Sequence, residues 1–429
     1  MRTTLGSLQW FVFILAGSIV APLSIGSAFG LPLPEIAAFM QRTLFVLGIA
    51  GILQAALGHR LPIMEGPAGL WWGIFLIYAG FAAAGGLDPY DALRQLEGAL
   101  FISGFLFAFL AVFKLVKYIR VLFTPLVTGT YLILLGAQLS GSFIKGMLGI
   151  GYVTEGIHVR VAVLSFVVVI ISILLSKSSN RLLSSYSVLI TLIIGWILFA
   201  AFDLTVAVKP AEGWMSVPEV FVWGMPSFQA GMGVTAILVG LLLLTNMIAT
   251  VQAVESVLEK QGHRTETVNM EKASFVMAVN QWLSGIFSAV GPVPISGTAG
   301  FIKETKVAQR LPFMIGSGLL AAISLFPAVT SFFAALPAPV GYATVFVPIA
   351  SLIGIGLKSY VEADPSETEY FIIAVSIMIG FGGMFVPADA VHSLPSFLQT
   401  VVNNGLILGL IVCILMEQIV RFMRWKRAG

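Results

Sequence analysis

Apolar stretches close to the length of a membrane-crossing helix recur along the whole chain, from Leu8 to Phe422. A helix needs about 20 predominantly apolar residues to cross the hydrocarbon core of a bilayer. Only 10% of the 429 residues are charged, whereas a soluble globular domain carries about 25% charged residues. We therefore expect an all-α polytopic membrane protein that folds within the lipid bilayer and has no sizeable soluble domain.

Breaking the apolar runs at charged or Pro/Gly-rich positions predicts about fourteen transmembrane segments. The first seven lie near residues 8–28, 37–58, 63–84, 96–113, 121–141, 159–176 and 182–203, and the second seven near residues 228–254, 271–289, 293–303, 311–334, 338–357, 369–387 and 397–422. We expect a first repeat at 1–203, an external linker at 204–227 and a second repeat at 228–429. Because seven is an odd number, the two repeats must have opposite orientations in the membrane.

The distribution of Lys and Arg predicts how the chain is oriented. If both termini are cytoplasmic, 18 of the 23 Lys and Arg residues fall on the cytoplasmic side, and the exceptions are Arg42, Arg94, Lys145, Arg160 and Lys209. The positive-inside rule predicts an asymmetry of this sign. We therefore expect a multi-pass protein of the plasma (inner) membrane with both termini in the cytoplasm.

Spans 3 and 10 are the ones most interrupted by residues that disfavour helices. Met64-Glu-Gly-Pro-Ala-Gly69 opens span 3, and Gly291-Pro-Val-Pro-Ile-Ser-Gly297 opens span 10. Interrupted segments at corresponding places in two halves point to a transporter's binding site. A half-helix that begins after Pro67 or after Ser296 would direct its backbone N–H groups and the positive end of its dipole into a cavity. The alternative is a pair of kinks with no ligand, because Gly and Pro are common in transmembrane helices.

Few polar side chains lie within the predicted spans, and such residues are functional candidates by default. Glu65 comes directly before the first Gly/Pro break. Asn246 and Thr250 in span 8 are four residues apart and so share one helix face. For Asn280 and Gln281 in span 9 the favoured interpretation is hydrogen bonding between helices.

The sequence shows no pattern of an enzyme. A single cysteine, Cys413, excludes a disulfide within the chain, and the four histidines fall at loops or span ends, at positions 59, 158, 263 and 392. There is neither a metal-ligand spacing nor a Walker A loop. We expect no catalytic residue, no metal, no cofactor and no nucleic-acid partner. Trp71 and Trp72 could stack on a flat ligand if they face a cavity, or pack in the core.

Several segments resemble the nucleobase–cation symporter family of uracil and xanthine permeases. They are Gln9–Pro22, Leu61–Gly66, Phe123–Gly129, Asn280–Pro294 and Thr305–Arg310, and the resemblance covers nearly the whole chain. It implies fourteen spans in two inverted repeats, with short strands and half-helices in spans 3 and 10. It also implies a core domain of spans 1–4 and 8–11 and a gate domain of spans 5–7 and 12–14, with the substrate bound between the strands.

The resemblance further implies where the substrate binds. The family's carboxylate in span 8 falls on Asn246, and the next polar position falls on Thr250. Its second carboxylate, in span 10, falls on Gly297 or Gly300. Gly69 on one side and Ser296 on the other would supply backbone contacts.

These positions depart from the family, because this chain lacks the two carboxylates there. The amide of Asn246 can form hydrogen bonds but cannot release a proton. Either the substrate is different or ion coupling has moved, and Glu65 is the carboxylate nearest in sequence that could bind the substrate or couple transport to protons.

We expect a secondary active transporter for a nucleobase such as uracil, xanthine or a related purine or pyrimidine, driven by H⁺ or Na⁺, with a homodimer as a possible assembly. The alternatives are an anion or carboxylate transporter of the same fold, as in the sulfate permease family, and a non-transporting membrane protein that has lost its site.

Overall fold

The computed structural model describes residues 2–83, 85–118, 124–154, 156–180, 183–184, 186–205, 213–262, 268–387, 390, 394, 398, 401–402 and 404–428. Of the charged positions used to predict the orientation, Arg120, Arg181, Lys209 and Arg264 lie outside these ranges, as do His263 and His392.

Across the described residues the chain is mainly helical, with one short strand in each half. The first half contains α1 (Arg2–Ser18), α2 (Val20–Ala28), α3 (Leu33–Ala56), β1 (Glu65–Pro67), α4 (Gly69–Ala83), α5 (Pro89–Val112), α7 (Pro125–Met147), α8 (Val159–Ser176) and α10 (Ser187–Ala201). The second half contains α11 (Ala230–Lys260), α12 (Met270–Ile286), β2 (Pro292–Pro294), α13 (Gly297–Thr305), α14 (Arg310–Ser324), α15 (Pro327–Ala334), α16 (Ala338–Ala363), α17 (Glu367–Met384) and α19 (Gly405–Ala428).

Each predicted span overlaps a helix, a pair of consecutive helices or a strand followed by a helix, although parts of the spans predicted at 121–141, 182–203 and 397–422 lie outside the described residues. Among the residues described, nine helices are long and apolar enough to cross a membrane, or ten if α13 and α14, which meet at a bend of 119°, count as one span. The predicted fold class, a polytopic helical membrane protein with strand and half-helix breaks in spans 3 and 10, is confirmed.

Local sequence signals set where several helices begin. The side chain of Asp88 accepts hydrogen bonds from the backbone N–H groups of Tyr90 and Asp91 at the start of α5. Thr124 caps α7 in the same way by accepting from Val127 N. In both helices a proline follows the cap, where its missing N–H costs nothing and its fixed φ suits the first turn.

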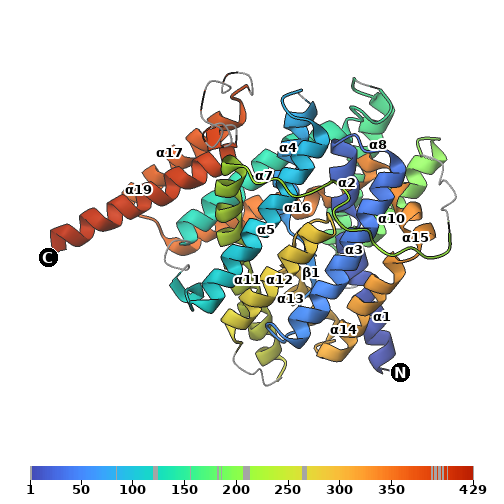
Figure 1. The fold of residues 1–429 in the computed structure, drawn as a ribbon, viewed down its shortest axis with the longest axis horizontal. Coiled ribbons are helices and arrows are strands. Elements are labelled where there is room, and N and C mark those ends of the chain that lie inside the picture. Colours follow the sequence, from blue (N-terminus) through green and yellow to red (C-terminus); the bar gives the residue numbers. More distant parts are fainter. Residues whose placement is uncertain are drawn as a thin grey trace.

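Helix contacts occur in matched pairs that relate the two halves. In chain order α3 corresponds to α12, α5 to α14, α7 to α16, α8 to α17 and α10 to α19. The contact of α3 with α14 is matched by that of α12 with α5, that of α8 with α10 by α17 with α19, and that of α7 with α19 by α16 with α10. Figure 1 shows α17 beside α19 at one end of the molecule and α1 beside α14 at the other. This exchange of partners is the pattern that an inverted repeat produces.

Glycines allow α7 to approach α16 closely, and α3 to approach α14. A Cβ atom placed on Gly129 in α7 would lie 2.9 Å from the carbonyl oxygen of Gly356 in α16, and one placed on Gly356 would lie 2.8 Å from the oxygen of Gly129. Between α3 and α14, a Cβ on Gly48 would lie 2.6 Å from Ser317 O and 2.7 Å from Ala321 N. Small residues at such crossings drive helix association in membranes, because backbones can then come into contact.

We predict that Gly48→Ala destabilises the protein by about 1–3 kcal/mol, because the added methyl group would meet backbone atoms that cannot move aside. Gly80→Ala is the matched control, since a Cβ there meets no atom within 4 Å and alanine favours a helix over glycine. Thermal unfolding of the purified variants in detergent measures the difference. Equal melting temperatures for the two variants would contradict the close packing of α3 on α14.

Candidate substrate site at the crossing of two half-helices

The two strands pair with each other in the middle of the fold. β1 and β2 are antiparallel, with Glu65 opposite Pro294, Gly66 opposite Val293 and Pro67 opposite Pro292. Hydrogen bonds from Ile295 N to Met64 O and from Ala68 N to Gly291 O, each 2.9 Å long, extend the pairing beyond the strands. The pair thereby satisfies backbone groups that the membrane interior could not satisfy.

A half-helix follows each strand, so the positive ends of two helix dipoles lie at the pair of strands, which we call the crossing. α4 begins at Gly69 and α13 at Gly297, as the sequence predicts. Ser296 precedes α13 without capping it through its side chain, and Ser296 and Gly297 are exposed. A Cβ on Gly69 would meet no atom within 4 Å, and one on Gly297 only a side-chain carbon at 3.8 Å. Three of the predicted site residues therefore border open space.

Asn246 and Thr250 meet at one backbone oxygen of β2. Asn246 Nδ2 and Thr250 Oγ1 each donate a hydrogen bond of 3.3 Å to the carbonyl oxygen of Pro294. Both side chains come from the same face of α11, as the four-residue spacing predicts. Thr250 is buried and Asn246 half-buried, so part of Asn246 remains accessible.

Gln281 fixes the other end of β2. Its Nε2 donates to Pro292 O at 2.8 Å, and its Oε1 accepts from Trp71 Nε1 at 3.0 Å. This is the hydrogen bonding between segments that the sequence indicates. Trp71 is fully buried and Trp72 is 6% exposed, which places both indole rings in the core. The neighbouring Asn280 is also fully buried, and within the part of the chain that the structure describes its amide forms no hydrogen bond.

Glu65 lies beside a histidine, and among the described residues no hydrogen bond joins it to Asn246 or Thr250. His59 Nε2 is 3.7 Å from Glu65 Oε1, and both side chains have no exposed surface. Neither carboxyl oxygen has a hydrogen-bond partner among the described residues. Glu65 is thus set apart from the residues at the open space, although it stands opposite Pro294 in the strand pair.

His59 is the residue that sequence reasoning missed. Its position in a loop after an apolar span suggests a solvated side chain, yet it is 1% exposed. One signal was available, because His59 lies only six residues before Glu65, which limits how far apart the two side chains can lie.

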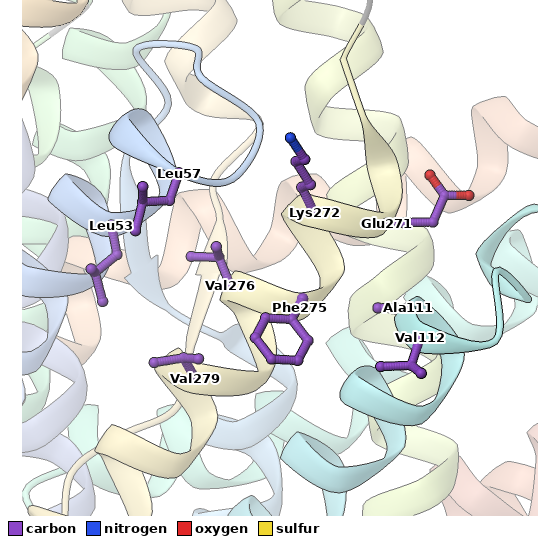
Figure 2. Close-up of a pocket in the computed structure, with 9 residues that line it drawn as sticks. All are labelled: Leu53, Leu57, Ala111, Val112, Glu271, Lys272, Phe275, Val276 and Val279. Atoms are coloured by element: carbon purple, nitrogen blue, oxygen red, sulfur yellow. The ribbon is translucent and has the colours of Figure 1, made fainter.

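A separate apolar pocket lies on the outer side of α3, α5 and α12 and contains none of the predicted site residues. Figure 2 shows its lining: Leu53, Leu57, Ala111, Val112, Glu271, Lys272, Phe275, Val276 and Val279. Apart from Glu271 and Lys272 these residues are apolar, so the pocket lacks the converging polar groups of a specific small-molecule site.

Solved structures of membrane transporters share this fold. The transmembrane domain of the cyanobacterial bicarbonate transporter BicA aligns with a TM-score of 0.65 and 17% identity, covering 96% of this chain and 98% of that one. The structure of SLC26A9 aligns with a TM-score of 0.66 and 11% identity, covering 96% of this chain and 65% of that one. At these identities the likeness shows the fold alone.

Curated relatives match along nearly the full length of the chain. "Putative purine permease YwdJ" of Bacillus subtilis is 40% identical over 430 residues, which are 100% of this chain and 97% of that protein. The xanthine permease of the same organism is 25% identical, covering 94% of this chain and 90% of that protein. The uric acid permease PucJ of Bacillus subtilis is 26% identical, covering 96% of this chain and 91% of that protein. The model of the Permease family, which represents xanthine and uracil permeases, matches residues 1–389, and the chain therefore belongs to this family of membrane transport proteins.

Proposed function

We propose that this protein is a secondary active transporter of a nucleobase, and that xanthine, uric acid or a related purine is its substrate. The observation that carries the proposal is the crossing of β1 and β2, where two half-helix N-termini, Asn246 and Thr250 lie around one strand pair. Family membership and the names of the relatives support the substrate class.

The chemistry of the site suits a neutral, planar ligand with donors and acceptors along its edge. The amide of Asn246 offers a donor and an acceptor, and Thr250 offers a hydroxyl group. Backbone N–H groups at the starts of α4 and α13 can donate to carbonyl oxygens of a base. A Cβ atom on Gly69 or Gly297 would meet no atom closer than 3.8 Å, so side chains do not crowd the starts of the two half-helices.

Transport would proceed by movement of a core domain against a gate domain, with the substrate carried at their boundary. The core would comprise spans 1–4 and 8–11, and the gate spans 5–7 and 12–14. Packing supports this division: α1, α3, α5, α11, α12 and α14 pack on one another, and α7, α8, α10, α16, α17 and α19 form a second group. We further propose residence in the plasma membrane with both termini in the cytoplasm, because Lys and Arg concentrate on that side.

Glu65 is the proposed coupling group, with H⁺ rather than Na⁺ as the ion. A carboxyl group with no exposed surface at membrane depth is expensive to maintain and marks ion pathways. Asn246 cannot carry a proton, so a coupling proton must reside elsewhere. Glu65 stands opposite Pro294, whose carbonyl oxygen Asn246 and Thr250 bind, so it is connected to the substrate site through the strand pair.

We predict that Asn246→Ala weakens nucleobase binding about 5- to 150-fold, because the loss of one or two hydrogen bonds at a buried ligand costs about 1–3 kcal/mol. Thermal-shift titration with xanthine, uric acid and uracil measures this, since a ligand at 100 times its Kd stabilises the folded protein by about 2.7 kcal/mol. Gln252→Ala is the matched control, because it removes an exposed amide from the same helix. Equal nucleobase stabilisation of Asn246→Ala and wild type would exclude Asn246 from the site.

The same titration separates the alternatives. Two half-helix N-termini with a neutral Asn246 would also suit a small anion, so bicarbonate, sulfate and a monocarboxylate are included. Stabilisation by an anion and by no base would favour an anion transporter. If no solute binds and reconstituted liposomes move none, a non-transporting role is favoured.

We predict that Glu65→Gln retains nucleobase binding but no longer concentrates the base against its gradient. The amide keeps the size of the side chain and cannot carry a proton. Uptake into proteoliposomes with an imposed pH gradient, and separately with a Na⁺ gradient, measures the effect. Glu97→Gln serves as the control, because Glu97 is another buried carboxyl group within a span and accepts a hydrogen bond from Ser288. Unchanged pH-driven accumulation by Glu65→Gln would exclude Glu65 as the coupling group.

A further inference from the structure

His59 and Glu65 form an isolated pair of titratable groups inside the protein. Both side chains have no exposed surface, and His59 Nε2 lies 3.7 Å from Glu65 Oε1. Within the described ranges, neither His59 Nε2 nor either oxygen of Glu65 has a hydrogen-bond partner. Buried polar groups without partners are rare in folded proteins and call for an explanation.

The backbone around His59 fixes which ring nitrogen carries the proton. Leu61 N donates a hydrogen bond of 3.0 Å to His59 Nδ1, so Nδ1 is an acceptor and the neutral ring carries its proton on Nε2. Gln54 holds the loop by accepting from His59 N at 3.3 Å and donating to Ala273 O at 3.1 Å. The loop thus presents one N–H donor to the carboxyl group of Glu65.

Glu65 is connected in turn to the proposed substrate site. It lies directly opposite Pro294 in the antiparallel pair, and the carbonyl oxygen of Pro294 accepts hydrogen bonds from Asn246 and Thr250. A change in the position of Glu65 would therefore shift the strand residue to which Asn246 and Thr250 are hydrogen-bonded. Such coupling between two sites is reciprocal, so substrate binding would act on Glu65 to the same extent.

We propose that His59 is a positioning residue that donates its Nε2–H to the ionised carboxylate of Glu65 and so sets the pH at which Glu65 exchanges its proton. The inference rests on the proposed role of Glu65 in proton coupling. When Glu65 releases its proton to water, its carboxylate accepts the hydrogen bond from His59, which is stronger than a bond between neutral groups. The ring keeps its own proton, and protonation of Glu65 from water opens the contact again.

Other titratable groups occur on the segments that pack around His59 and Glu65. β1 packs against α1, α3 and β2. Among the side chains that the structure describes on these elements, the titratable ones besides Glu65 are Glu35 and Arg42 of α3, and Arg42, the nearer of the two in sequence, lies 17 residues before His59. Arg60 follows His59 and is exposed, and Glu271 and Lys272 begin α12 next to Ala273. His59 is therefore the group placed to act on Glu65 directly.

The test is the pH profile of nucleobase uptake by proteoliposomes that contain wild type, His59→Leu or His59→Gln. Uptake requires protonated Glu65 and falls as the external pH rises. Removal of the donor disfavours the carboxylate, so Glu65 keeps its proton to higher pH, and the midpoint for His59→Leu should rise by about one to two pH units. His59→Gln supplies an N–H group and should restore a midpoint near that of wild type. His158→Leu is the matched control, because His158 accepts from Val161 N at the start of α8, away from the strand pair.

Counterflow of labelled base without a gradient distinguishes the outcomes. His59→Leu should retain counterflow within about twofold of wild type, and in a Glu65→Gln background it should leave the pH profile unchanged. Loss of counterflow in His59→Leu would mean a purely structural role and would overturn the proposal, as would a wild-type midpoint. If wild type itself shows no counterflow, the proposed function is wrong, and if its counterflow is intact but its uptake is independent of pH, the coupling role of Glu65 is wrong.

Discussion

The pairing of β1 with β2 is the interaction on which the rest of the structure depends. A chain that leaves the helical conformation at membrane depth exposes N–H and C=O groups that lipid cannot satisfy. Two breaks at equivalent positions solve this problem together, because each strand supplies the partners of the other. The half-helices, the open space beside Gly69 and Gly297, and the hydrogen bonds from Asn246 and Thr250 all follow from that arrangement.

The two halves share a scaffold but differ in chemistry. Their helix contacts correspond pair by pair, down to the reciprocal approach of Gly129 and Gly356. At the crossing, however, β1 contributes Glu65, which lies beside His59 of the preceding loop, whereas β2 consists of Pro292, Val293 and Pro294. The symmetric part of the fold is therefore the shared scaffold of helices, and the asymmetric part lies at the strand pair.

Much of the fold could be predicted from the sequence, because its signals are local. Apolar length gives the spans, and a run such as Gly291–Gly297 cannot continue a helix, so the breaks and the starts of α4 and α13 are visible in the residues themselves. The convergence of Asn246 and Thr250 on one side also follows, since helical periodicity alone places them on one face.

The rest depends on contacts between distant segments. The packing of α11 and α12 against β2 determines that Gln281 binds Trp71. It also determines that the Pro294 carbonyl accepts hydrogen bonds from both Asn246 and Thr250. The burial of His59 depends on Gln54 and on the opposite helix α12. Such partners have no fixed spacing along the chain, and a loop histidine is by default a solvated residue.

Proline occupies three of the six strand positions, Pro67, Pro292 and Pro294. Each proline removes a backbone N–H donor that would otherwise need a partner in the bilayer. The strand pair therefore has fewer backbone groups that must be hydrogen-bonded than an ordinary pair of strands. A shift of register would place prolines, which have no N–H group, opposite carbonyl groups that now accept hydrogen bonds. An additional strand would likewise find few backbone N–H donors on this pair. The crossing is therefore restricted to one alignment of two strands.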